Sequence, residues 1–358
     1  MSKSFRCCVV GGGPGGVMLS YLLARRGVPV TLLEAHHDFD RDFRGDTVHP
    51  STLEILDQFG LAHRLLELPH RKMSRLDFHT EEGIAFSVDM TRLKTRFPYV
   101  MMLPQVDFLN FMVDEAKKYP SFKIIMGANV QRLIERDGKV CGVRYRDTDS
   151  NWHDVEAELT VGADGRFSKL RRLANLTPEE TAPPMDVLWF RLPRESSDNE
   201  EAGAGIVGRG ELLVLLNRKD EWQAGFVIPK GEFKRFKEAG IGVLRESVSR
   251  LAPWLSDRAN LLQDWKQVQI LSVASSCLKR WFKPGLLLIG DAAHVMSPVG
   301  GVGINYAIQD AVVAANVLAK PLSSGRVSTR DLYSVQRKRM KPTRFIQTVQ
   351  RILQRRLV

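Results

Sequence analysis

The fold is decided by residues 5–34, FRCCVVGGGPGGVMLSYLLARRGVPVTLLE. Residues 5–10 are a short apolar run rich in β formers, which predicts a buried parallel strand. Residues 17–27 predict a helix, with two arginines near its carboxyl end and a glycine as its cap. Residues 30–33 predict a second strand, which ends in Glu34. The stretch therefore has the order strand, turn, helix, strand.

The turn of this unit is rich in glycine, and it is followed by a well-placed acidic residue. Because glycines have no Cβ atom, the backbone N–H groups of the turn can come close to a pyrophosphate. The amino end of the next helix adds partial positive charge. Glu34, 18 positions after the last glycine, can accept hydrogen bonds from both hydroxyls of a ribose. We therefore expect an adenosine-type dinucleotide with a free 2′-hydroxyl. The turn residues expected to meet it are Gly11, Gly13, Pro14, Gly15 and Gly16.

A second GxGxxG pattern occurs at residues 203–208. It follows the polar stretch 194–201 and leads into the strand-like run 211–216 rather than into a helix. Because the motif needs a strand before it and a helix after it, we expect a loop here without nucleotide contact.

Two later segments narrow the kind of dinucleotide. Residues 159–171, LTVGADGRFSKLR, run from an apolar strand through a glycine turn into a helix start. Residues 286–294, LLLIGDAAH, again end a buried strand in Gly-Asp, and residues 298–305, PVGGVGIN, lead into an apolar helix. With these motifs in this order, the chain resembles the flavoprotein aromatic hydroxylases of the para-hydroxybenzoate hydroxylase type, which are single-component FAD monooxygenases. The resemblance covers nearly the whole chain.

The resemblance implies bound FAD and places several residues at it. Glu34 would hold the adenosine ribose, and Asp291 the ribityl or pyrophosphate part. Asp164 would serve both FAD and the pyridine nucleotide, although Asp-Gly after a strand is also a common turn former. The backbone of five consecutive residues would lie against the isoalloxazine ring: Gly301, Val302, Gly303, Ile304 and Asn305.

Two further positions match the family less specifically. Arg44 lies in the loop where such enzymes place an arginine near the flavin, and a solvated loop charge is the alternative. Gln105 stands before the apolar helix 106–116, where the family keeps a Gln or Arg near FAD. His294 is assigned no chemistry, and the catalytic residues stay unknown, since the flavin carries the chemistry.

The implied fold is α/β, with a Rossmann-like FAD-binding domain interleaved with a mixed β-sheet substrate domain. The FAD-binding domain is expected at 1–73, 98–180 and 270–325, the substrate domain at 74–97 and 181–269, and a basic helical segment at 326–358. Within the substrate domain we expect strands at 212–216 and 222–229 and helices around 231–239 and 241–252, and a strand at 268–275 follows them.

The implied activity is FAD-dependent monooxygenation. NADH or NADPH would reduce FAD, O₂ would add at flavin C4a, and the hydroperoxide would pass one oxygen atom to an aromatic or polycyclic small molecule. The protein would hold the substrate near C4a and exclude water. Hydroxylation is favoured, but epoxidation and Baeyer–Villiger oxidation use the same scaffold, and the substrate stays open.

Other functions of an FAD-binding chain remain as alternatives. FAD-dependent halogenases carry a WxWxIP element, and Ala224 and Phe226 stand here where its tryptophans should be. A reductase of polyprenyl or similar lipids and a catalytically idle FAD-binding protein are the other two alternatives.

Charge is concentrated at the carboxyl end of the chain. The 358 residues carry a net charge of +11, of which residues 326–358 contribute +9. The rest, with 42 basic and 40 acidic residues, gives no argument for nucleic acid. The tail spaces Phe345, Val349, Ile352 and Leu353 along one helical face, which we expect to pack on the body; contact with a membrane surface is the less favoured alternative.

The remaining signals are weak. The four cysteines form no CxxC or Cys/His cluster, so we expect neither a metal site nor a disulfide framework. Glycines interrupt the apolar run at the N-terminus. No other stretch reaches the length of about 18 apolar residues that a membrane helix needs. A cytoplasmic protein is the default expectation; its oligomeric state is open, as is whether the chain continues beyond Val358.

Overall fold

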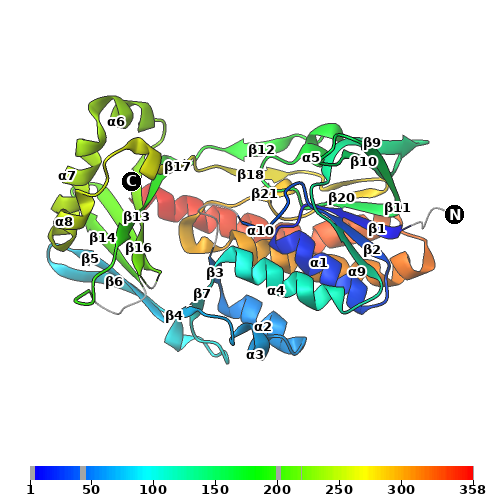
Figure 1. Ribbon diagram of the computed structural model, residues 1–358, viewed down its shortest axis with the longest axis horizontal. Coiled ribbons are helices and arrows are strands. Elements are labelled where there is room, and N and C mark those ends of the chain that lie inside the picture. Colours follow the sequence, from blue (N-terminus) through cyan, green and yellow to red (C-terminus); the bar gives the residue numbers. More distant parts are fainter. Residues whose placement is uncertain (1–4, 41–45, 199–202, 219, 358) are drawn as a thin grey trace. The chain divides into compact units, whose positions relative to one another are not determined.

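The computed structural model describes residues 5–40, 46–198, 203–218 and 220–357. Their contacts divide the chain into two units, and Figure 1 labels most of the helices and strands. The first unit takes Met1–Gly45, Pro104–Thr181 and Ser275–Thr348, and the second takes Asp46–Leu103, Ala182–Ala274 and Val349–Val358. The chain therefore alternates between the units, as in an interleaved α/β fold. The functional domain ranges given above stay a prediction, because they concern which residues meet cofactor and substrate.

A mostly parallel sheet forms the core of the first unit. Its strands are β1 (Phe5–Val10), β2 (Val30–Leu33), β8 (Phe122–Ile125), β9 (Asn129–Arg136), β10 (Lys139–Arg146), β11 (Trp152–Gly162), β19 (Phe282–Lys283) and β20 (Leu286–Leu288). Their order is β19-β20-β11-β1-β2-β8, in which β20, β11, β1, β2 and β8 run parallel. β9 and β10 form an antiparallel ribbon on β11.

The helix after β1 packs closely on this sheet. α1 (Pro14–Arg25) contacts α4 (Gln105–Lys117) and α9 (Gly303–Ser324), which lie near it in Figure 1. Two turn glycines are required by this packing: a Cβ on Gly16 would lie 1.9 Å from the carbonyl oxygen of Gly11, and one on Gly11 would lie 2.4 Å from that of Ala163. The predicted unit of strand, turn, helix and strand is confirmed.

α9 and the turn before it, Val299–Ser324, form the one helix among the described residues that is long and apolar enough to cross a membrane. The sequence reading, which found no such stretch, missed it. Ala311, Ala315 and Leu318 of α9 are buried, and the helix packs along α1. A core helix passes the same test of length and composition, and these contacts are those of a core helix.

Cys7 and Cys8 of β1 have no exposed surface. Burial raises the pKa of both thiols, that of Cys8 to about 12. Because the thiolate is the reactive species, we expect iodoacetamide at about pH 8 to leave both cysteines of the native protein unmodified and to label them after unfolding. Peptide mass mapping checks this, and labelling of Cys8 in the native protein would contradict the buried central strand.

A seven-stranded sheet forms the core of the second unit. In spatial order its strands are β17 (Gln269–Leu271), β13 (Met185–Pro193), β16 (Glu221–Pro229), β15 (Glu211–Asn217), β14 (Gly203–Gly208), β5 (Arg75–Thr80) and β6 (Gly83–Asp89). One face packs against α6 (Phe233–Ala239), α7 (Ile241–Leu251) and α8 (Ser256–Ala259), burying side chains such as Phe226 and Leu244. The strands predicted at 212–216 and 222–229 and both predicted helices are confirmed.

Two expectations for this unit are wrong. Residues 203–208 form β14, which pairs with β15 and β5, and not a loop. Its glycines allow this because a Cβ on Gly205 would come 2.3 Å from the ring of Phe78, which occupies that space. The strand expected at 268–275 is broken: β17 ends at Leu271, and Ser275 begins β18 in a different sheet.

Smaller elements complete the two units. One three-stranded sheet contains β12 (Pro178–Thr181), β18 (Ser275–Leu278) and β21 (His294–Val295), and another contains β3 (Thr47–Val48), β7 (Val100–Met102) and β4 (Arg71–Met73). The remaining helices are α2 (Pro50–Gln58), α3 (Ala62–Leu65), α5 (Lys169–Leu173) and α10 (Thr329–Leu357), with short 3-10 turns between elements.

α10 does not pack as the sequence predicts. Phe345, Ile352 and Leu353 are 69%, 51% and 45% exposed, so the expectation that this apolar stripe packs on the body is wrong. The helix buries polar side chains instead. Gln336 and Thr343 are among the buried ones. The half-buried Gln347 donates through Nε2 to the backbone carbonyls of Ser276 in β18 and Val295 in β21, at 2.9 and 3.0 Å. Buried carbonyl groups need hydrogen-bond donors, so the surface beside this helix favours polar side chains. The periodicity of apolar residues in the helix cannot show that need. Membrane contact by the exposed face stays an untested alternative.

Candidate FAD site

Four parallel strands end in register at one edge of the first unit's sheet. Val10 at the end of β1 pairs with Leu33 of β2 and with Gly162 of β11, and Gly162 pairs with Leu288 of β20. Ligands of open α/β sheets bind outside this edge. The predicted site residues Gly11 and Glu34 directly follow β1 and β2, and Asp164 and Asp291 follow β11 and β20 within three residues. Three motifs far apart in the sequence are therefore brought together.

The turn after β1 offers both space and hydrogen-bond donors. Gly13 has φ −73°, which any residue adopts, and a Cβ there would meet nothing within 4 Å. Pro14 is the first residue of α1, and no described side chain caps this helix end. Gly15, by contrast, serves packing, since its Cβ would lie 3.1 Å from the carbonyl oxygen of Ala307. Packing therefore does not require a glycine at position 13, and the close approach of a phosphate there stays a prediction.

Glu34 is fixed at the end of β2 by backbone donors. It is buried, its Oε2 accepts the N–H of Gly12 at 2.7 Å, and its Oε1 accepts the N–H of His36 at 2.9 Å. These two hydrogen bonds hold the carboxylate beside the glycine turn, and its contact with a ribose diol stays a prediction.

Asp164 is engaged within the chain. Its two oxygens accept the Ser168 hydroxyl at 2.6 Å and the N–H of Leu170 at 2.9 Å, at the start of α5. Burial raises the pKa of Asp164, although these hydrogen bonds act in the opposite direction. Direct contact of this residue with FAD or a pyridine nucleotide stays a prediction.

Arg171 has a role that the sequence did not show. Its guanidinium donates to the carbonyl oxygens of Asp291 at 3.3 Å, Ala292 at 3.1 Å and Arg166 at 2.8 Å. It thereby ties the loop after β11 to the turn after β20. Its place at the end of DGxxSxxR was a signal, but a motif does not reveal which carbonyls an arginine meets.

The loop before α9 presents backbone groups rather than side chains. Gly300 and Gly301 adopt left-handed conformations with φ 79° and 61°, and α9 begins at Gly303 without a capping side chain among the described residues. Asn305 is buried, and its Nδ2 donates to the Gly301 carbonyl at 3.4 Å, so it holds the loop. An uncapped helix start carries partial positive charge and suits an anionic edge of the flavin. The ring contact expected for residues 301–305 stays a prediction.

The other two expected cofactor residues are less informative. Gln105 is the half-buried first residue of α4, and Arg44 lies outside the described residues. In the part of the chain that the structure describes, no group of three or more His, Cys, Asp or Glu side chains could hold a metal ion.

The residues present fit FAD. Two uncapped helix starts supply N–H donors, the space at Gly13 admits a phosphate, and the carboxylate of Glu34 supplies an acceptor for ribose hydroxyls. Such a donor set would hold a dinucleotide across the edge of the parallel sheet.

We expect Asp291→Ala to remain folded but to purify with much less flavin. Asp291 lies half-buried in the 3-10 turn Gly290–Ala292, whose backbone contacts to Arg171 the substitution leaves intact. Loss of one hydrogen bond involving a charged group would weaken FAD binding about tenfold or more. The ratio of flavin to protein absorbance measures this, with the exposed Asp149→Ala as control; full retention of flavin would rule out the role of Asp291.

A parallel α/β unit with this edge and these motifs defines an FAD-binding oxidoreductase. The chain belongs to the family described as "FAD binding domain", whose model matches residues 4–344. It is 31% identical, over 98% of its length, to 6-methylpretetramide 4-monooxygenase of Streptomyces rimosus, of which it covers 84%. It is thus an enzyme of the FAD-dependent monooxygenase class.

Solved structures agree on the fold. The probable FAD-dependent monooxygenase PqsL of Pseudomonas aeruginosa has a TM-score of 0.81 at 19% identity, with 97% of this chain and 94% of that chain covered. The myxobacterial chondrochloren halogenase CndH has a TM-score of 0.83 at 19% identity, with 97% and 81% covered. At this level of identity the likeness concerns the architecture alone.

Proposed function

We propose that this chain uses FAD, O₂ and either NADH or NADPH to insert one oxygen atom into an aromatic or polycyclic small molecule, favouring hydroxylation. The observation that carries this is the meeting of the glycine turn and Glu34 at one sheet edge, with the first turns of α9 beside them: a Cβ on Gly15 would lie 3.1 Å from the carbonyl oxygen of Ala307. The named monooxygenase relative supports the oxygenation. FAD, when bound, supplies the redox and oxygen-transfer chemistry.

The chain's own residues bind and orient. The N–H groups at the start of α1 would meet the phosphates, Glu34 would accept the ribose hydroxyls, and the start of α9 would face negative charge on the flavin. None of these groups needs to exchange a proton, which fits a site in which the cofactor does the chemistry.

The aromatic side chains on one face of the seven-stranded sheet support the proposal of an aromatic substrate. A Cβ on Gly225 would lie 2.9 Å from the indole of Trp189, so this ring lies over the glycine; Phe78 lies over Gly205 in the same way. Phe78 also stacks on Phe86, with ring centroids 4.2 Å apart. Strand alternation puts these rings on the face opposite to the one that packs on α7. Flat aromatic walls favour planar ligands.

The test is turnover of a panel of phenols and polycyclic aromatic compounds under ¹⁸O₂. We expect one compound to stimulate oxidation of NADH or NADPH and to leave with a single ¹⁸O atom. Comparing the two nicotinamides identifies the reductant. Oxidation that yields only hydrogen peroxide across the panel would count against the proposal.

The rival functions give different results in the same assay. A halogenase would need chloride or bromide and give a halogenated product, a lipid reductase would take up no O₂, and an idle FAD-binding protein would oxidise neither nicotinamide faster with any compound. Ala224 and Phe226, where a halogenase carries tryptophans, are buried in the core that packs on α7. We further propose a cytoplasmic protein without a nucleic-acid partner. The near-neutral charge of residues 1–325 supports the second of these two proposals.

A further inference from the structure

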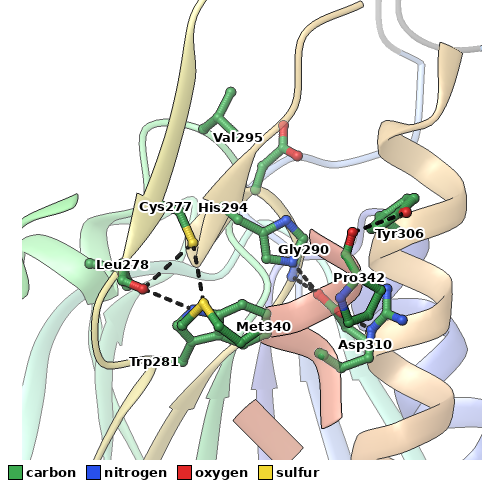
Figure 2. A network of polar contacts seen from close by, with 12 residues as sticks. Cys277, Leu278, Trp281, Gly290, His294, Val295, Tyr306, Asp310, Met340 and Pro342 are labelled. Atoms are coloured by element: carbon green, nitrogen blue, oxygen red, sulfur yellow. Dashed lines mark hydrogen bonds and ion pairs between the residues drawn. The ribbon is translucent and has the colours of Figure 1, made fainter. Parts of the chain in front are cut away.

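A fully buried carboxylate lies behind the candidate site. Asp310 of α9 has no exposed surface, and three donors converge on it, two of them from Gly290 and His294, which Figure 2 labels beside it. Its Oδ2 accepts the N–H of Gly290 at 2.9 Å and His294 Nε2 at 2.6 Å, and its Oδ1 accepts Arg339 Nε at 2.6 Å. No motif that predicted the cofactor site contains Asp310 or Arg339.

The charge of Asp310 is maintained by its partners. Burial acts to raise the pKa of Asp310, but His294 and Arg339 outweigh it through charge and hydrogen bonds and hold that pKa below its usual range. A buried charge persists only where partners compensate for the lost water. The side chains of Asp310, His294 and Arg339 therefore form one buried ionic network.

This network contacts the turn that carries Asp291. Gly290 begins the turn in a left-handed conformation with φ 57°, and a Cβ there would lie 3.0 Å from the Cβ of Ala307. Asp310 holds the N–H of this glycine, while Arg171 holds the carbonyl oxygens of the turn. The turn is thus fixed from both sides.

Arg339 brings α10 into the network. Its guanidinium lies over the ring of Tyr306, 5.2 Å from the centroid. One turn earlier, Gln336 accepts the N–H of Trp281 at 3.0 Å and donates to the carbonyl of Lys279 at 2.8 Å. Within the first unit α10 therefore makes two kinds of polar contact: Arg339 reaches the turn through Asp310, and Gln336 meets the segment of Lys279 and Trp281.

Stability alone does not account for the arrangement. His294 Nδ1 and Arg339 Nη2 are buried and have no hydrogen-bond partner in the described part of the chain. Unpartnered buried polar atoms lower stability, and apolar residues of similar shape would avoid that loss. Buried polar networks of this kind are retained where they fix a geometry that function needs.

We infer that Asp310, held by Arg339 and His294, is a positioning residue for bound FAD: by fixing the N–H of Gly290 it sets the turn that places Asp291 at the cofactor. Through Arg339, α10 contributes to cofactor binding although it lies outside every cofactor motif. The inference rests on the FAD site described above.

The experiment compares Asp310→Asn, Arg339→Met and Arg339→Lys with two matched variants of α10. Gln336→Met removes a buried polar contact that does not reach the turn, and Arg337→Met removes an exposed arginine. Apo-proteins are titrated with FAD by flavin fluorescence, and the absorption spectrum and reduction potential of the bound flavin are recorded. Thermal unfolding of each apo-protein reports on stability separately.

We expect Asp310→Asn and Arg339→Met to bind FAD about tenfold or more weakly and to shift the flavin potential, with Arg339→Lys recovering part of the affinity. Gln336→Met should lower the melting temperature without changing FAD affinity, and Arg337→Met should change neither. FAD affinity and flavin potential at the wild-type level in Arg339→Met would overturn the inference, as would a loss in Gln336→Met equal to that in Arg339→Met. Failure of the wild-type protein to bind FAD would instead contradict the cofactor assignment.

Discussion

Gly13→Val is expected to fold normally and to purify almost free of flavin. The chain itself accepts a side chain at position 13, because φ is −73° and an added Cβ would meet nothing within 4 Å. The isopropyl group would stand where the N–H groups of the turn meet a pyrophosphate. Losing two hydrogen bonds to a charged group, each worth about 1.5–3 kcal/mol, would weaken FAD binding about a hundredfold or more.

Titration of the apo-protein with FAD measures this effect, and thermal unfolding checks the fold. Gly242→Val is the matched control, because a Cβ on Gly242 also meets nothing within 4 Å but the residue lies in α7 of the second unit. Both variants should keep their folded apo-form, and Gly13→Val alone should lose FAD. Wild-type affinity in Gly13→Val would show that the turn does not touch the cofactor.

Glu34→Gln is expected to reduce FAD affinity about tenfold to a hundredfold. The amide keeps the shape of the side chain, but it replaces one acceptor by a donor where the carboxylate now accepts the N–H groups of Gly12 and His36. The variant therefore loses both the orientation of the side chain and an acceptor for the ribose diol.

FMN provides a sharp control for this prediction, since it lacks the adenosine ribose. Its affinity, however weak, should be the same in the wild type and in Glu34→Gln, while the affinity for FAD falls. The exposed Glu135→Gln should change neither. Equal losses for FAD and FMN would mean that Glu34 supports the fold of the turn and does not recognise the ribose.

The first strand, helix and second strand could be predicted because their signals are local. An apolar run, a glycine turn, a helix pattern and a second apolar run follow one another within residues 5–34, and the structure reproduces the three elements as β1, α1 and β2. The meeting of the three motifs could also be predicted, since parallel strands end at the same edge of a sheet.

Long-range contacts decided what the sequence could not show. Residues 203–208 have the composition of a loop, but pairing with β5 and β15 and the ring of Phe78 over Gly205 make them a strand. The network of Asp310, His294 and Arg339 joins segments whose proximity no local pattern encodes. Arg339 itself lies in a stretch that reads as basic surface.

The buried face of α10 is a further feature that the sequence pattern did not predict. An apolar stripe usually marks the buried side of a helix, yet Phe345 is largely exposed and Gln336 is buried. The partners of this face are backbone carbonyl and N–H groups, for which glutamine is a suitable residue. The spacing of apolar residues describes one helix alone and gives no information about the surface against which that helix packs.

The most direct test of an FAD-dependent oxygenation at this site is the isotope content of the product formed under ¹⁸O₂ by wild type and Gly13→Val. The substrate is the first panel compound that stimulates NADH or NADPH oxidation. One ¹⁸O atom per product molecule is expected from the wild type, and no product from the flavin-free variant. Product oxygen that comes from water, or equal labelling by both proteins, would contradict the account.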